Sequence, residues 1–371
     1  MIRRTWAMLI KELIQLRRER MTFALMIAVP LMQLVLFGYA IDTNPRSLPT
    51  AVLANDTSEP ARAVLAAMQA TGYFDIVAEA RGEAEVDSLI HQGKAMFVIE
   101  IPAGFGRDVR RGLAPEILVI ADAADPTAAG NAIAALDALP ARALANQRLV
   151  PRAREGAAPF GFVVHRRYNP AGEASLNIVP GLVGTILTLT LVIFTSLAVT
   201  RETERGTMEN LLALPIRPVE IMLGKIAPYV LIGAVQLGLI LGAARLLFDV
   251  PIEGSLWLLC ALTTLFILAN LAIGYTFSTL ARNQLQAMQM AVMFFLPSIL
   301  LSGFMFPFLG MPRWAQVIGE ILPLTHYLRI IRGITLKGAT FPDLNQEVLA
   351  LALFTIAAMA LAAVRFRRTL D

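Results

Sequence analysis

Long stretches without charge are the feature that most constrains this fold. No Asp, Glu, Lys or Arg occurs between Arg282 and Arg313, and charge-free apolar stretches also cover 21–41, 176–199, 256–280 and 348–364. A helix that spans a bilayer needs about twenty apolar residues, and a charge at mid-span costs roughly 2.5–3.5 kcal/mol. Only 16% of the residues are charged, against roughly 25% in soluble domains. The sequence therefore predicts a polytopic α-helical membrane protein.

About six transmembrane helices and one α/β domain account for the whole chain. The spans are predicted at 21–41, 175–199, 226–248, 256–280, 286–307 and 346–364, with a tail at 365–371. Residues 1–20 alternate basic and apolar positions at helical spacing, which predicts an amphipathic helix in the membrane interface. The alternative is a basic leader that only orients the chain. Because this leader and the apolar stretch after it are both long, we expect an uncleaved first span.

Between the first two spans, residues 42–174 have the composition of a soluble domain. Short apolar runs predict strands at 50–55, 73–77, 95–101 and 116–121, and helices are predicted at 58–70, 86–92 and 127–148. The first of these helices is expected to be capped by Ser58 or Thr57. Alternating strands and helices indicate an α/β domain, and 156–161 is expected to be a loop that returns to the membrane.

The distribution of basic residues predicts the orientation. If the N-terminus is cytoplasmic, the leader, the 201–225 segment, Arg282 and the basic tail all lie inside, as the positive-inside tendency requires. The α/β domain and the semi-polar segment 312–337, within the region 308–345, then lie outside. We expect the latter to dip into the interface as a re-entrant hairpin. The single cysteine, Cys260, excludes an internal disulfide. The expected location is a bacterial inner (cytoplasmic) membrane, with both termini cytoplasmic.

Several classes of function are disfavoured by what the sequence lacks. The net charge of +4 does not indicate nucleic-acid binding, because most basic residues flank the spans. His91, His165 and His326 lack partners at metal-ligand spacing, so neither a metal site nor a membrane enzyme is expected. No Asp, Glu or Lys lies within 21–41, 176–199, 226–248, 256–280, 286–307 or 348–364, which disfavours ion coupling. No phosphate-binding loop is present, so any ATP would be bound by another protein, and no cofactor is expected on this chain.

The segment 200–225 is the most informative loop. Glu202, Arg205 and Glu209 are spaced to share one helix face, leucines follow them, and Pro215 and Pro218 end the helix. A short charged helix with an apolar edge suits docking of a soluble partner. From the pattern alone, a solvated loop that only orients the protein is an equal alternative.

Motifs along the whole chain resemble those of the type-2 ABC exporter permeases, in the daunorubicin-resistance-permease-like subgroup with a large periplasmic domain. They are Arg201-Glu-x-Glu-Arg-Gly-Thr-x-Glu209, Pro215 to Lys225, Asn169-Pro170, Pro180-Gly181, Gln286-Ala-Met-Gln289, Leu301 to Pro307, Pro323-Leu324, Arg329-x-x-Arg-Gly333, the Arg365-Phe-Arg-Arg368 tail and Asp122-x-x-Asp-Pro-Thr127. One departure is Leu214, where the family often has Thr.

This resemblance implies an exporter permease subunit, not itself an enzyme, that works with a second permease subunit, identical or paralogous, and two ABC ATP-binding subunits. It implies that 200–225 holds the coupling helix, beside Lys11 and Glu12 of the interface helix. The coupling residues it implies are Arg201, Glu202, Glu204, Arg205, Gly206, Thr207, Glu209, Leu211, Pro215, Glu220 and Lys225. In similar exporters a large outer domain is associated with a periplasmic adaptor protein and an outer-membrane channel; the alternative is that it only packs against its twin.

The substrate path is predicted from polar positions in the second and fifth spans, which face the dimer interface in related permeases. These positions are Thr185, Thr188, Thr195, Ser298 and Ser302. Most intramembrane hydroxyls bond to their own helix, which is the alternative for each. Gly238-x-x-x-Gly242 is a further signal, for close helix approach. Two functions stay open: export of hydrophobic or amphipathic compounds such as drugs or lipids, and mechanical transmission to the outer domain without passage of substrate.

Overall fold

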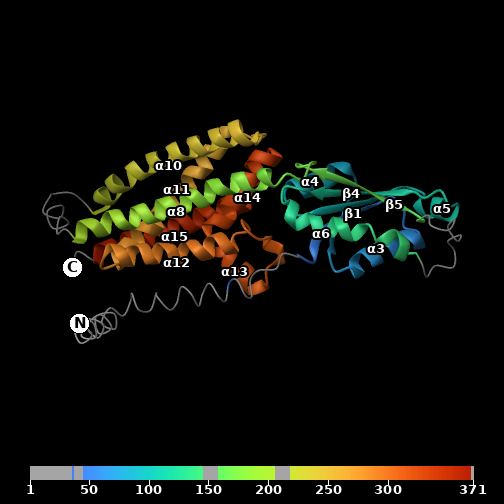
Figure 1. Cartoon of the computed structure of the whole chain (residues 1–371), viewed down its shortest axis with the longest axis horizontal. Helices are drawn as coiled ribbons and strands as arrows, with labels where there is room; N and C mark the ends of the chain where they lie inside the picture. The colour runs from blue at the N-terminus through green and yellow to red at the C-terminus, as the bar shows by residue number, and fades with distance from the viewer. Residues whose placement is uncertain (1–35, 37–44, 145–157, 205–217, 369–371) are drawn as a thin grey trace, which may run out of the picture.

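The computed structural model describes residues 36, 45–144, 158–204 and 218–368, and it consists of two parts (Figure 1). An α/β domain lies at one end of an elongated molecule, and a bundle of long helices forms the rest. We call the end of the bundle beside the α/β domain the domain end. The opposite end, near residues 204 and 218, is the loop end. The predicted interface helix and, except for Leu36, the predicted first span lie outside the described residues.

A five-stranded sheet forms the centre of the α/β domain. Its strands are β1 (Leu48–Ala54), β2 (Phe74–Glu79), β3 (Phe97–Ile101), β4 (Glu116–Asp122) and β5 (Gly161–Arg167), in the order β2-β1-β3-β4-β5. Only the β3–β4 pair is antiparallel. The first four strands coincide with predicted ones. The fifth was missed, because its residues are half-buried or exposed at the sheet edge and show no apolar alternation.

Helices cover both faces of this sheet. They are α3 (Glu59–Ala70), α4 (Glu83–His91), α5 (Phe105–Arg110), α6 (Pro126–Leu136) and α7 (Leu139–Arg142). Leu48 and Val52 of β1 pack with α3, α5 and α6, whereas Ala51 and Leu53 pack with α4 on the opposite face. This alternation is the period of two that a strand imposes, and it buries the apolar residues of β1 on both sides.

Two details of the predicted helices were wrong. Ser58 occupies the N-cap position of α3, but its side chain makes no capping bond; its backbone amide donates to the Asp56 carboxylate (2.7 Å). The helix predicted at 127–148 is divided into α6 and α7 within its described part. Pro140 explains the division, since a proline lacks an amide hydrogen and clashes with the carbonyl four residues earlier.

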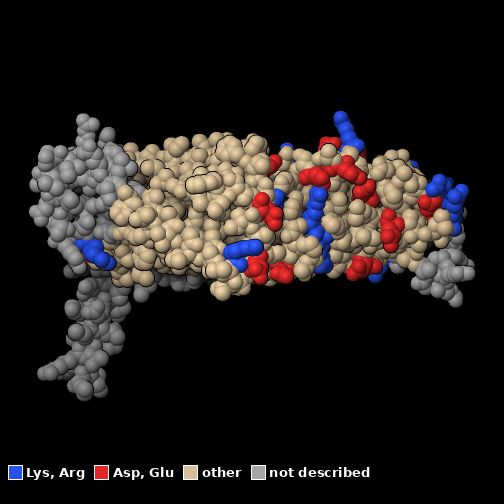
Figure 2. Space-filling model, turned by 90° about the horizontal axis from the view of Figure 1, so that it is seen from above, with Lys and Arg blue, Asp and Glu red and all other residues tan. Residues whose placement is uncertain are grey.

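Among the described residues, five helices are long and apolar enough to cross a membrane. They are α8 (Ala174–Glu204), α10 (Pro218–Phe248), α11 (Leu256–Leu280), α12 (Gln284–Leu301) and α15 (Asn345–Arg368). The α12 helix ends six residues before the predicted end at 307, because Gly303 adopts a φ of 83° that continues no helix. On the face shown in Figure 2, charged residues gather over the α/β domain and are almost absent from the bundle.

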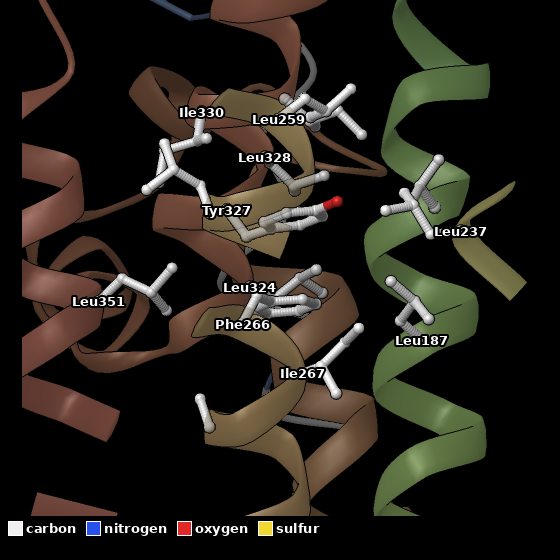
Figure 3. Close-up of a cluster of buried hydrophobic side chains, with 14 of the residues drawn as sticks. Leu187, Leu237, Leu259, Phe266, Ile267, Leu324, Tyr327, Leu328, Ile330 and Leu351 are labelled. Atoms are coloured by element: carbon white, nitrogen blue, oxygen red, sulfur yellow. The ribbon is translucent and has the colours of Figure 1, made fainter. Parts of the chain in front are cut away.

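Two short helices occupy the segment 312–337. They are α13 (Arg313–Ile321) and α14 (Pro323–Lys337), joined by Leu322, whose extended backbone is favoured by the proline that follows. The α14 helix is buried among α8, α11 and α15 at the domain end. In Figure 3 the Tyr327 ring lies over Phe266, with ring centroids 4.1 Å apart, and the Tyr327 hydroxyl lies 2.9 Å from Thr263 Oγ1. The re-entrant path of this segment through a membrane stays a prediction.

Glycine determines how closely α14 approaches α8. A Cβ at Gly184 would lie 2.8 Å from Leu324 and 2.9 Å from Tyr327, so a larger residue would push the helices apart. The pair singled out from the sequence, Gly238 and Gly242, has no described atom within 4 Å of a Cβ at either position. Within the described part of the chain, close helix packing therefore depends on other glycines than the predicted pair.

Candidate functional site

The loop ends of α8 and α12 are joined by polar contacts. The Glu204 carboxylate accepts the backbone amide of Gln284 (2.7 Å) and its side-chain amide (2.5 Å), while Arg201 Nε donates to Gln284 Oε1 at 3.4 Å. These bonds lower the pKa of Glu204, the side-chain bond contributing most. An anionic acceptor suits this position, because a helix N-terminus has unsatisfied amides and a positive dipole end.

The sequence of the short α11–α12 connection explains where α12 begins. Asn283 accepts the backbone amide of Gln286 (2.8 Å), and Gln286 Oε1 accepts the amide of Arg282 (2.9 Å). This arrangement differs from a capping box, because Gln286 accepts the amide of the residue before the N-cap and not that of Asn283 itself. It leaves the Gln284 amide available to Glu204, so the last turn of α8 is tied to the first turn of α12.

Only part of the predicted coupling segment is described. Arg201 and Glu204 make the contacts above; Glu202 lies in α8, and Glu220 and Lys225 lie in α10. The remaining predicted residues lie outside the described ranges: Lys11, Glu12, Arg205, Gly206, Thr207, Glu209, Leu211 and Pro215. The structure therefore places the flanks of the predicted coupling helix at the loop end, and the role of the segment stays a prediction.

All five hydroxyl residues of the predicted substrate path are buried. Four donate to carbonyls of their own helix: Thr185 to Leu182 (3.1 Å), Thr188 to Gly184 (2.8 Å), Ser298 to Phe294 (2.7 Å) and Ser302 to Ile299 (3.4 Å). These four bonds match the alternative stated for intramembrane hydroxyls. The fifth, Thr195, lies at the contact of α8 with Gly274 of α11, and its hydroxyl has no partner among the described residues.

Two polar residues of the bundle were not singled out from the sequence. Asn270 of α11 is fully buried; its Nδ2 donates to Phe266 O (2.9 Å), and its Oδ1 has no described partner. Gln236 of α10 has its Oε1 3.1 Å from the Thr190 hydroxyl of α8. An amide side chain inside a predicted span was the available signal for both. Gln236 therefore makes a polar contact between α10 and α8, and Asn270 is a buried polar side chain of α11.

A charged junction joins the α/β domain to the domain end of the bundle. Asp122, at the end of β4, pairs with Lys337 at the end of α14, and the Lys337 ammonium lies 5.3 Å from the Tyr168 ring centroid. Asp125, the N-cap of α6, accepts a bond from Asn177 of α8 (3.3 Å). Burial raises the pKa of Asp125, and the nearby Arg332 guanidinium opposes that shift. Helices α8 and α14 of the bundle therefore meet α6 of the domain at the turn between β4 and α6.

A second ionic network lies nearer the start of α14. Arg329 contacts Glu320 of α13 (2.6 Å) and Glu347 of α15 (3.1 Å). His326 contacts Glu347 through Nδ1 (2.5 Å) and the Glu320 carbonyl through Nε2 (2.8 Å). The α15 helix begins at Asn345, so Glu347 belongs to its first turn rather than to a loop. No group of metal-ligating side chains occurs within the described residues, and we interpret this network as one that holds α13, α14 and α15 together.

Comparison with known proteins gives matches along the whole chain. Residues 20–364 match the family described as ABC-2 family transporter protein. The chain is 31% identical to the probable multidrug ABC transporter permease YbhS of Escherichia coli, over 100% of this chain and 98% of that protein. It is 28% identical to the probable multidrug ABC transporter permease YbhR of the same organism, over 99% of both chains.

A third relative covers less of the chain. The inner membrane transport permease YhhJ of Escherichia coli is 32% identical over 77% of this chain and 76% of its own length. Together with the five membrane-length helices, the family match over most of the sequence and the full-length similarity to YbhS agree with the resemblance seen in the motifs. The chain belongs to the ABC-2 family of transporter proteins, as a type-2 ABC transporter permease.

Proposed function

We propose that this permease exports hydrophobic or amphipathic compounds, such as drugs or lipids, with energy from a separate ATP-binding subunit. The observation that carries the proposal is the similarity over the full chain to proteins named as probable multidrug ABC transporter permeases. The surface of the bundle is nearly uncharged on the face shown in Figure 2, which suits contact with the hydrocarbon of a membrane.

The proposed complex contains two permease subunits, identical or paralogous, and two ATP-binding subunits. The segment 200–225 is the proposed docking element, because it is charged and continues directly from α8. The tie between Glu204 and Gln284 supports this role, since a force on the segment would reach α8 and α12 together.

The proposed orientation puts both termini and the loop end in the cytoplasm of a bacterial cell, with the α/β domain in the periplasm. Basic residues near the loop end, including Arg201 and Arg282, support it through the positive-inside tendency. A periplasmic α/β domain is also the element that we propose to contact an adaptor protein and, through it, an outer-membrane channel.

The test is co-expression with the candidate ATP-binding subunit, followed by affinity purification and measurement of ATP turnover in nanodiscs. We expect wild type to retain the ATP-binding subunit and Glu209→Arg to lose both binding and turnover. Glu79→Arg, an exposed charge reversal in the α/β domain, serves as the matched control and is expected to behave as wild type. Failure of wild type to bind any ATP-binding subunit would contradict the proposal.

Mechanical transmission without passage of substrate is the second candidate. It is favoured by the hydroxyls of the predicted substrate path, four of which bond to their own helices and so offer no free hydroxyl hydrogen to a substrate. A flux assay separates the two functions. ATP-dependent efflux of a fluorescent hydrophobic dye from cells supports export, whereas ATP turnover without efflux of any tested compound supports transmission.

A further inference from the structure

The turn between β4 and α6 meets α14 at two charged positions. Asp122 pairs with Lys337, and Asp125 interacts electrostatically with Arg332, five residues earlier in the same helix. The two side chains of the Asp122–Lys337 pair are each only 12% exposed. A pair with this burial differs from a solvated surface salt bridge, because removal of either partner would leave a charge without compensation.

At the second position, that of Asp125 and Arg332, the hydrogen bonding of the guanidinium is incomplete. Arg332 Nη1 donates to the Gly303 carbonyl (3.2 Å), but Nε and Nη2 are buried and have no described partner. These two nitrogens form the edge of a guanidinium that binds a carboxylate through two parallel bonds. The Oδ1 atom of Asn177 is also buried without a described partner, while its Nδ2 donates to Asp125. Buried polar atoms without partners are costly, so a shift that brought Asp125 onto the free edge of Arg332 would be favourable.

The helix that carries Asn177 also reaches the loop end. Asn177 lies in the first turn of α8, and Glu204, which is tied to α12, is the last residue of the same helix. At 1.5 Å per residue these positions are about 40 Å apart. Because Gly184 lets α14 pack directly on α8, the two helices that contact the turn are also in close contact with each other. A displacement of the whole of α8 would therefore move Asn177, which donates to Asp125.

We propose that the turn 122–125 and α14 form a two-point clasp. This clasp moves the α/β domain when the ATP-binding subunit acts on the permease. The Asp122–Lys337 pair keeps the domain attached, and Arg332 closes on Asp125 as α8 shifts. This inference rests on the proposed function, because it requires an ATP-binding subunit that acts at the loop end. It assigns Asp125, Asn177 and Arg332 as positioning residues rather than as residues that touch cargo.

The experiment measures a distance across the clasp in the intact complex. Spin labels are placed at two exposed positions, 137 in the α/β domain and 253 in the α10–α11 connection, in a Cys260→Ser background. The permease is assembled with its ATP-binding subunit in nanodiscs. Distances are then compared without nucleotide and with trapped ATP. We expect the distance distribution to shift with ATP, and Asp125→Asn and Arg332→Gln to abolish the shift while ATP turnover persists.

Charge exchange and a matched control separate coupling from folding. Asp122→Lys alone is expected to lose the shift, and Asp122→Lys combined with Lys337→Asp is expected to regain it. Asp75→Asn, an exposed carboxylate in the same domain, should leave the shift intact. A shift that survives Asp125→Asn and Arg332→Gln, or that is absent from wild type with active ATP turnover, would overturn the clasp. If wild type does not bind the ATP-binding subunit, the proposed function is contradicted, and the clasp that rests on it is contradicted as well.

Discussion

Gly274 of α11 lies so close to α8 that a Cβ at this position would be 2.8 Å from the carbonyl oxygen of Val192. The obstacle is backbone, which cannot rotate away as a side chain can. The same Cβ would also lie 3.0 Å from the Cβ of Thr195, whose hydroxyl has no described partner. The α8–α11 contact therefore requires glycine at position 274.

Gly274→Ala is expected to lower the stability of the permease by about 1–3 kcal/mol, the usual cost of an added methyl group in a tightly packed contact. Thermal unfolding of the purified protein in detergent measures the effect. Gly238→Ala is the control, because nothing described lies within 4 Å of its Cβ; alanine there should be neutral or stabilising by up to about 1 kcal/mol. Equal unfolding temperatures for the two variants would contradict the packing argument.

Glu204→Ala is expected to loosen the first turn of α12. The substitution removes the acceptor of the Gln284 backbone amide, which lies in the first turn of α12 and so has no carbonyl of its own helix to bond. Hydrogen exchange followed by mass spectrometry should show faster exchange in a peptide covering 282–288, with no change in peptides from α11.

The matched control for this prediction is Glu79→Ala, which removes an exposed carboxylate far along the chain in β2. If exchange at 282–288 is the same in both variants, Glu204 does not stabilise α12. If Glu204→Ala also lowers ATP-driven transport while Glu79→Ala does not, the tie between α8 and α12 contributes to coupling.

Much of the fold was predictable because its strongest signals are local. Long apolar stretches define the helices that can span a membrane, and short apolar runs, two of them ended by Pro102 or Asp122, define the first four strands. Strand β5 escaped prediction because an edge strand buries little of either face. The end of α12 was predicted six residues too late, since 302–307 are as apolar as the helix itself and the decisive feature is the backbone of Gly303.

The contacts between distant segments were not predictable in the same way. The motifs around Asp122 and Arg329 were recognised separately, but nothing local indicates that residue 122 meets residue 337, or that His326 meets Glu347. Such pairs depend on how α14 folds back into the bundle. The predicted coupling segment lies largely outside the described residues, so its predicted role continues to rest on the resemblance and on the contacts of Arg201 and Glu204.

Tyr327→Phe is expected to destabilise the permease by about 1 kcal/mol, the typical net value of one hydrogen bond. The lost bond joins Tyr327 to Thr263, which still donates to the Leu259 carbonyl (2.7 Å). Tyr327→Ala should cost about 3–5 kcal/mol, because it also removes the ring that stacks on Phe266. Unfolding temperatures of the two variants, with Tyr73→Phe in the α/β domain as control, test this order; a Tyr327→Phe variant as unstable as Tyr327→Ala would contradict it.

Asp56→Asn is expected to destabilise the α/β domain at neutral pH and to have little effect in acid. Burial alone would raise the pKa of Asp56, but amide bonds from Gly106 (2.9 Å) and Ser58 (2.7 Å), with the charge of Arg110, lower it below the ordinary value. A carboxyl with a lowered pKa in the folded state contributes stability that is complete above its unfolded pKa, about 3.9. That contribution is lost as the pH falls through the lower, folded value.

The unfolding temperatures of wild type and Asp56→Asn should therefore differ at pH 7, begin to converge below about pH 4, and meet only when the pH falls below the folded pKa, where the wild-type carboxyl also becomes neutral. Asp75→Asn, an exposed carboxylate of β2, should show no such pH-dependent difference. The expected difference is modest, since Asp56 is only partly buried and water screens its charge. A difference that persists unchanged at pH 3 would mean that Asp56 acts through the shape of its side chain, not through the charge that accepts the two amides.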